Sequence, residues 1–391
     1  MKSRVDHSTS APSSFAERAN AWFWQRVSSS VEVPADSLGL FRWIYGVFLL
    51  VETPYFAWID HVPHGLFNPP ILSPAFLLGG FPASPFFSIL DAIVVASLCL
   101  VTVGYRTRFF TVVLIAGLLA GFNFRYSFGK VDSDIIILMV LVCMEMAGWG
   151  NYYSIDVLLG RVDRVASLEA QHQANRGLSL FAVLLSFGMI TAGLGKARSW
   201  IDFNLRTSGF LMWFYPQYYD LGRHLLLAKW VPHIPIPALE LGDYLGPMFE
   251  LSGFPALLYS RRTWRMWLFI ACTFHLMNAL LLNIAFNEQA LSYLLFVDLS
   301  SVAFTRWQRF AQRRVIVALS CFVFFLGMSH IVMRSFGYGS RIVFVSSVDR
   351  EQPFFLYFCI PICAFVLARL ARALVGPHRD GRNRREHAAL D

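Results

Sequence analysis

The strongest constraint on the fold is a series of apolar runs long enough to cross a membrane. Short segments rich in charged and turn-forming residues separate these runs. About twenty apolar helical residues match the thickness of the hydrocarbon core of a bilayer. The sequence therefore predicts an all-α fold, a polytopic membrane helix bundle of about ten transmembrane helices without a lumenal β domain. The expected spans are 39–58, 86–104, 109–128, 133–150, 177–196, 244–260, 264–284, 289–305, 315–334 and 353–372.

Composition supports the membrane class. Of the 391 residues, 56% are hydrophobic and only 15% are charged, whereas soluble domains carry about 25% charged residues. The net charge of +8 comes largely from arginines between apolar runs and in the tail, so we expect no nucleic-acid partner. All six cysteines fall in apolar stretches, which predicts buried thiols and no metal. Only for Cys359 and Cys363, four residues apart, does metal binding stay open as an alternative.

The arginines predict the orientation in the membrane. Every second connection is short and basic, and the first of these carries Arg106 and Arg108. Cytoplasmic loops hold the excess of Lys and Arg, so both termini are expected in the cytoplasm. The span 244–260 contains Pro247 and Pro255 and is the weakest, but removing it would break the alternation.

The chain divides into four expected parts. The N-terminal segment contains "FAERANAWFWQRVSSSV", which is either an interfacial helix or an unstructured tail. The long outer loops 59–85 and 197–243 are too aromatic for solvated linkers, so we expect short interfacial helices that cover a cavity. The parts are a cytoplasmic segment (1–38), a transmembrane domain (39–305), two further helices (306–372) and a basic cytoplasmic tail (373–391).

Ionisable residues inside spans are costly and point first to a functional interior. Arg42 lies near the start of its span and either belongs to such an interior or snorkels to the cytoplasmic headgroups. His330 is expected near an interface or hydrogen-bonded in the core. The residues in or bordering spans are Arg42, Glu52, Asp91, Asp132, Asp134, Glu145, Lys196, Glu250, His275, Asp298 and His330.

His275 and Asn278 lie one helical turn apart at mid-span, in "IACTFHLMNALLLNIAF". They either join helices through hydrogen bonds or bind a polar ligand group. Glu250 is either a neutral buried acid or the partner of a cation such as Lys196. Both alternatives stay open at this point.

Lys196 follows "GMITAGLG", whose small residues allow another helix or a ligand to approach closely. The lysine is either an anchor at the membrane boundary or a base. A base requires desolvation or a neighbouring cation to deprotonate it. Arg198 and Trp200 are typical interface anchors.

Three motifs in order resemble a known family. "SLGLFRWIYGVFLLVE" (37–52), "GLGKARSW" (193–200) and "FHLMNALLLNIAFN" (274–287) are similar to stretches of the transmembrane part of vitamin K-dependent gamma-carboxylase and of the wider bacterial horizontally transferred transmembrane (HTTM) family. The resemblance covers residues 37–305. It implies a quinone-handling membrane fold with a reduced, vitamin K-type quinone as cofactor.

The resemblance also implies roles for residues. Lys196 matches the base that deprotonates the hydroquinone, and His275 and Asn278 match side chains that shape the quinone site. Arg42 and Trp200 match architectural positions. Asp132 or Asp134 stands where the carboxylase has a histidine, and Gly195 replaces a second lysine. Because the chain ends soon after its last span, we do not expect the lumenal domain that recognises a protein substrate.

Three functions follow as expectations. The first is a quinone- or lipid-binding membrane protein; if it is an enzyme, we expect a carboxylase-like or quinol-linked one with Lys196 as base. The second is a non-enzymatic accessory protein for maturation or export of a secreted peptide or protein. The third is a transporter that uses the buried charges as a relay, against which the lack of a detectable repeat argues.

Overall fold

The computed structural model describes residues 14–71, 73–128, 134–162, 168–204, 206–300, 311–338, 341–343, 345 and 350–375. Over these residues the chain is all-helical, and its one β contact is an isolated antiparallel bridge between Glu52 and Ile342. The α-helices are α1 (Phe15–Val31), α2 (Asp36–Val51), α3 (Pro74–Leu78), α4 (Phe86–Val103), α5 (Thr107–Arg125), α6 (Ile135–Ala147), α7 (Ile155–Leu158), α8 (Leu168–Trp200), α9 (Gly209–Tyr215), α10 (Ile236–Leu251), α11 (Gly253–Tyr259), α12 (Arg261–Leu282), α13 (Asn287–Ser292), α14 (Ala311–Ser335) and α15 (Glu351–Val375).

Six helices of the described chain are long and apolar enough to cross a membrane. They are α4, α5 with its extension to Phe128, α8, α12, most of α14, and α15. Helices α1 and α2 pass the same test only as a pair bent by 69°, which would make seven. The chain thus has the helices of an integral membrane protein, but the expected number of about ten spans is not confirmed.

Three of the expected spans take other forms. Helix α6 has 13 residues and ends at Gly148, whose φ of 68° favours glycine. Residues 244–260 are divided between α10 and the seven-residue α11. Residues 287–296 form the short helix α13 and a 3₁₀ helix, with Glu288 and Asn287 buried. A short helix enclosed by others need not span the bilayer, because protein rather than lipid surrounds it.

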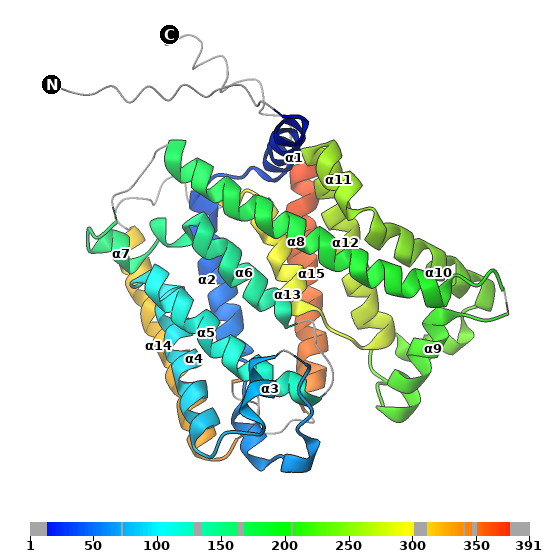
Figure 1. The fold of residues 1–391 in the computed structure, drawn as a ribbon, viewed down its shortest axis with the longest axis horizontal. Coiled ribbons are helices and arrows are strands. Elements are labelled where there is room, and N and C mark those ends of the chain that lie inside the picture. Colours follow the sequence, from blue (N-terminus) through cyan, green and yellow to red (C-terminus); the bar gives the residue numbers. More distant parts are fainter. Residues whose placement is uncertain are drawn as a thin grey trace, which may run out of the picture.

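The helices form one bundle, crossed by the long helix α8 (Figure 1). Helix α4 packs against α2, α5 and α14, while α12 and α13 pack against α15. Helix α8 contacts α6 near one side of the bundle and α10 near the other. Helices α14 and α15, which fall within the part 306–372 expected to hold two further helices, pack against α4 and α12 respectively.

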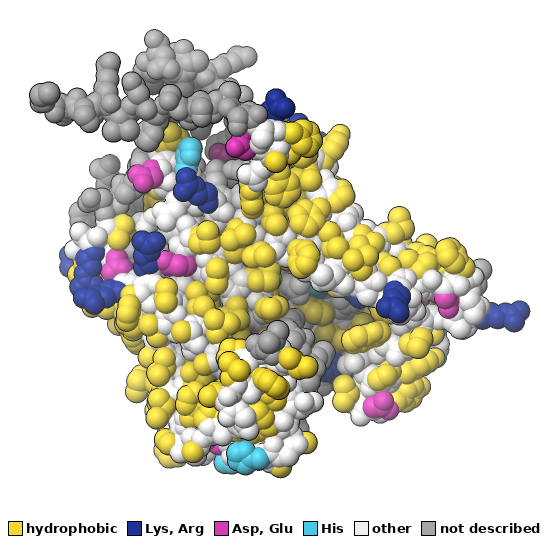
Figure 2. Space-filling view, viewed as in Figure 1, with side chains coloured by type: hydrophobic (Ala, Val, Ile, Leu, Met, Phe, Trp, Pro, Cys, Tyr) yellow, Lys and Arg dark blue, Asp and Glu magenta, His cyan; other side chains and the backbone are white. Residues whose placement is uncertain are grey.

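The outer surface is apolar over much of its area (Figure 2). Large side chains such as Ile93, Phe109 and Phe325 are 43–60% exposed on α4, α5 and α14. Exposed apolar patches of this extent are unusual on soluble monomers and suit contact with lipid. The face drawn in Figure 2 is hollowed between the lobe that carries α9 and the lobe that carries α3.

The segments expected at the membrane surface contain short helices. Helix α1 begins with a capping box of Ser14 and Glu17, so residues 15–31 are helical and not an unstructured tail. Trp22 of α1 remains 52% exposed. The first outer segment contains two 3₁₀ helices, Ala57–His61 and His64–Leu66, followed by α3. The second contains α9 and two further short helices, Pro216–Asp220 and Ala228–His233. Their contact with a membrane stays a prediction.

Candidate functional site

Lys196 and Glu250 form an ion pair between the packed helices α8 and α10. The Glu250 side chain is 2% exposed and that of Lys196 is 25% exposed. One turn before the lysine, a Cβ on Gly193 would lie 3.0 Å from Glu250 Cβ. The small-residue run before Lys196 therefore allows α10 to approach, which brings the carboxylate within reach of the ammonium.

Two aromatic rings flank the Lys196 ammonium. Its Nζ lies 5.4 Å from the ring centroid of Phe274 and 5.7 Å from that of Trp200, both within cation–π range. Trp200 thus faces the lysine, while Arg198 is exposed and has no partner among the described residues. Of the two expected anchors, Trp200 therefore contacts the lysine of the site and Arg198 does not.

The polar end of α8 marks where the chain leaves the apolar region. Thr207 donates a hydrogen bond of 2.8 Å to Asp202, and the Asn204 amide donates another of 2.9 Å. These bonds stabilise the carboxylate and lower the pKa of Asp202. An ionised, solvated turn thus follows Lys196 within a few residues.

His275 lies in the same region and is bound to a tyrosine that sequence reasoning missed. Its Nε2 is 2.8 Å from the Tyr293 hydroxyl, and both side chains are buried. The Phe274 ring links His275 to the lysine: its centroid lies 5.4 Å from Lys196 Nζ and 5.7 Å from that of the His275 imidazole. Tyr293 stands in the apolar run "LSYLLF". Its hydroxyl needs a partner when it is buried, and this need was the one feature of the sequence that could have indicated the contact.

Asn278 is less closely associated with this cluster. It is half-buried, and its main-chain oxygen accepts a hydrogen bond of 3.3 Å from Ile284 at the end of α12. Its side chain has no hydrogen bond to any residue that the structure describes. The structure therefore brings together Lys196, Glu250 and His275, while Asn278 stays a predicted ligand residue without a contact to them.

Two polar atoms of the cluster have no protein partner in the described chain. They are Oε2 of Glu250 and Nδ1 of His275, and both are buried. Leaving such an atom unsatisfied costs about 1–3 kcal/mol. Depending on the tautomer, Nδ1 either donates or accepts a hydrogen bond. The cluster thus retains hydrogen-bonding capacity for a polar group that enters it.

Arg42 is fully buried and serves the architecture. Its guanidinium donates to the carbonyl oxygens of Thr102 (3.3 Å), Trp149 (2.7 Å), Tyr152 (3.2 Å) and Tyr153 (2.7 Å). Four carbonyls from two distant segments are thus held by one side chain. A guanidinium satisfied in this way does not snorkel to the headgroups.

Asp134 lies in a different polar cluster. It pairs with Arg125, and its Oδ1 lies 3.8 Å from the Arg341 guanidinium. Glu52 and Glu288 are each 3.7 Å from the same guanidinium. No contact in the described chain joins Asp134 to Lys196, so the predicted ligand set is divided between two places. Asp132 lies outside the described residues.

Two further ionisable residues in or bordering spans, Asp91 and His330, hydrogen-bond to the main chain. Asp91 is buried and accepts main-chain hydrogen bonds of 2.9 Å from both Phe56 and Ala57. His330 is buried, with Nε2 2.5 Å from the Leu50 carbonyl oxygen.

Cys359 and Cys363 are in contact, with their sulfur atoms 3.7 Å apart. Among the described residues, no group of three or more His, Cys, Asp or Glu side chains could hold a metal ion.

Comparison with known proteins leaves this geometry as the main guide to function. No family model matches the chain, and neither a curated protein nor a solved structure matches it.

Proposed function

We propose that the cluster of Lys196, Glu250 and His275 binds a lipid-soluble molecule with an acidic hydroxyl group, and that Lys196 accepts the proton of that hydroxyl. A reduced quinone of the vitamin K type is the candidate ligand. The observation that carries the proposal is a lysine paired with a buried carboxylate, next to two buried polar atoms without protein partners in the described chain.

The residues present suit a hydroxylated ring. Phe274 and Trp200 offer ring faces beside the Lys196 ammonium. His275 Nδ1 and Glu250 Oε2 offer hydrogen-bonding positions for hydroxyl groups. When bound, a reduced quinone supplies the acidic hydroxyl and the reducing electrons.

Proton transfer needs Lys196 to be a neutral amine first. Burial of the pair disfavours separated charges, so the proton can pass from Lys196 to Glu250. The free amine then accepts the hydroxyl proton and becomes an ammonium. Lys196 would then hold that proton next to the ligand oxygen from which it came, while Glu250 would keep the first proton.

The resemblance of residues 37–52, 193–200 and 274–287 to the HTTM family and to vitamin K-dependent gamma-carboxylase supports a carboxylase-like use of this proton transfer. Membership of that family is part of the same proposal. So are the topology of ten spans, the cytoplasmic position of both termini and the location in a bacterial inner membrane. The arginine pattern of the connections supports the orientation.

A second candidate function is favoured by the exposed lobe around α9. Phe203, Met212, Tyr219 and Trp230 are 57–83% exposed there. Such a surface also suits docking of a secreted peptide by an accessory protein without catalysis. Substitution of these four residues would then abolish function, while substitution of Lys196 would not.

The test is binding of a reduced naphthoquinone, menadiol, to the full chain in lipid nanodiscs under anaerobic conditions. The matched variants are Lys196→Met and Lys229→Met. Lys229 also lies over a tryptophan ring, 5.7 Å from the centroid of Trp230, but it is exposed and has no carboxylate partner among the described residues.

We expect Lys196→Met to weaken menadiol binding by about tenfold or more, which corresponds to about 1.4 kcal/mol. Lys229→Met should bind like the native chain. Equal affinity of all three proteins would refute the assignment of Lys196. A loss shared by both lysine variants would indicate a general effect of charge.

A further inference from the structure

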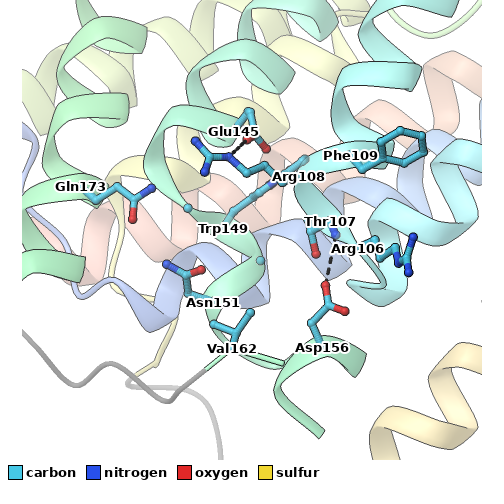
Figure 3. Close-up of a pocket in the computed structure, with 12 residues that line it drawn as sticks. Arg106, Thr107, Arg108, Phe109, Glu145, Trp149, Asn151, Asp156, Val162 and Gln173 are labelled. Carbon is cyan, nitrogen blue, oxygen red and sulfur yellow. Dashed lines mark hydrogen bonds and ion pairs between the residues drawn. The ribbon is translucent and has the colours of Figure 1, made fainter. Parts of the chain in front are cut away.

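A cavity of about 440 Å³ lies away from Lys196, at the start of α5. Figure 3 shows its lining: the first residues of α5, the turn after α6, α7 and the N-terminal part of α8. Its polar lining residues are Arg106, Thr107, Arg108, Glu145, Asn151, Asp156 and Gln173.

Both carboxylates in the lining already have partners. Glu145 Oε1 accepts from Arg108 Nε at 3.0 Å. Asp156 accepts from the Thr107 amide at 3.2 Å and lies 3.5 Å from Arg161 Nη1. Arg106 has no partner in the described chain. The lining thus holds two arginines and two carboxylates, and Arg161, which lies beside Asp156 but outside the lining, adds a further positive charge nearby.

Three buried side chains in the lining have polar atoms without a hydrogen bond in the described chain. One is Asp156, whose Oδ1 lies 3.5 Å from Arg161 Nη1 and is charge-balanced by it. The other two are donors: Nε1 of Trp149, which is 2% exposed, and Oγ1 of Thr107, which is 5% exposed. The indole nitrogen can only donate, and the hydroxyl can donate as well. Such donors need an acceptor-rich ligand. The N-terminus of α5 adds the positive end of its helix dipole.

We propose that this cavity binds the phosphate group of an anionic membrane lipid. Phe109 at its rim is 60% exposed on the outside of α5, where it can contact an acyl chain while the phosphate enters the cavity. The short basic connection that carries Arg106 and Arg108 is predicted to face the cytoplasm. Basic pockets between helices on that side are where anionic headgroups bind.

Arg42 acts here as a positioning residue. It holds the Trp149 carbonyl oxygen at 2.7 Å and the Tyr153 carbonyl oxygen at 2.7 Å. These two hydrogen bonds hold the main chain of the turn that carries Trp149. This second site does not depend on the role of Lys196.

The experiment measures binding of phosphatidic acid to the full chain in phosphatidylcholine nanodiscs, by displacement of a spin-labelled phosphatidic acid. Three variants are compared with the native chain: Thr107→Val, Arg106→Gln with Arg108→Gln, and Arg313→Gln with Arg314→Gln. Valine keeps the shape of threonine without its hydroxyl. Arg313 and Arg314 are two exposed arginines at the start of α14, outside the cavity lining.

We expect the paired change at 106 and 108 to weaken phosphatidic acid binding by about tenfold. Thr107→Val should weaken it by a few fold, and the paired change at 313 and 314 should leave it within about twofold. Equal losses in both arginine pairs would overturn the site, because they would show diffuse charge attraction. If inorganic phosphate competed as strongly as phosphatidic acid, the proposal that the bound phosphate group belongs to a lipid would be overturned.

Discussion

Arg42 and Lys196 are both basic residues within apolar helices, but their surroundings differ. Arg42 is fully buried and donates to four main-chain carbonyl oxygens. Lys196 is 25% exposed, has one carboxylate partner, and lies near buried polar atoms that no described group satisfies. Sequence position alone treats the two similarly, since each lies near one end of an apolar run.

The difference shows how a basic residue in the membrane interior can be classified. A guanidinium saturated by carbonyls has no capacity left for a ligand, so its removal should damage the fold. An ammonium paired with a single buried carboxylate keeps that capacity and can exchange its proton. The following predictions test this distinction, from the largest expected effect to the smallest.

Replacement of Arg42 should have the largest effect on stability. Arg42→Leu leaves four carbonyl oxygens without their donor, so we expect a loss of roughly 3 kcal/mol or more. Arg42→Lys should also destabilise, because an ammonium lacks the planar fork that reaches all four. Thermal unfolding in detergent measures both variants.

The matched control for Arg42 is Arg198→Leu. Arg198 is exposed on the last turn of α8, so its replacement should change stability by no more than about 0.5 kcal/mol. If Arg42→Leu were as mild as this control, the architectural role of Arg42 would be disproved.

The ion pair of Lys196 and Glu250 should show strong coupling. Lys196→Met leaves a buried carboxylate without its cation, and we expect a loss of about 1–3 kcal/mol after allowance for the partial exposure of the lysine. Adding Glu250→Leu should restore part of that loss. A double-mutant cycle of unfolding free energies measures the coupling, and additive losses would show that the two side chains act independently.

Of the substitutions at Arg42, Lys196 and Tyr293, loss of the Tyr293 hydroxyl should have the smallest effect on stability. Tyr293→Phe removes the hydrogen bond to His275 Nε2, for which about 1 kcal/mol is expected. Menadiol affinity should change as well, because the imidazole loses the group that fixes its orientation. Unfolding and binding measured on the same preparation separate the two effects; unchanged affinity would place Tyr293 outside the ligand site.

Much of the helical framework could be predicted from the apolar runs. The expected spans 86–104 and 353–372 closely match α4 and α15, because long apolar helices leave few alternatives in a bilayer. The expected span 177–196 lies within the longer α8. The run 244–260 was predicted as one span, although Pro247 and Pro255 already marked it as weak; the structure ends α10 at Leu251 and begins α11 at Gly253.

The candidate site was predictable only in part. Lys196, Glu250 and His275 were expected from their position in apolar runs, and the pairing of Lys196 with Glu250 was one of two open alternatives. Tyr293 was missed because a tyrosine in an apolar run carries no charge signal. The carboxylate of Glu288 and the guanidinium of Arg341, which meet at 3.7 Å, lie far apart in the sequence, so their encounter was not foreseeable.

The sequence by itself determined that the chain forms apolar helices and that a few ionisable side chains stay within them. It did so because hydrocarbon accepts only helices with satisfied main-chain groups and tolerates few charges. Only the tertiary structure decided which charges meet. Contacts between residues 42 and 149–153, or between 196 and 250, depend on helix packing. That packing gives Arg42 four carbonyl partners and gives Lys196 a single carboxylate partner.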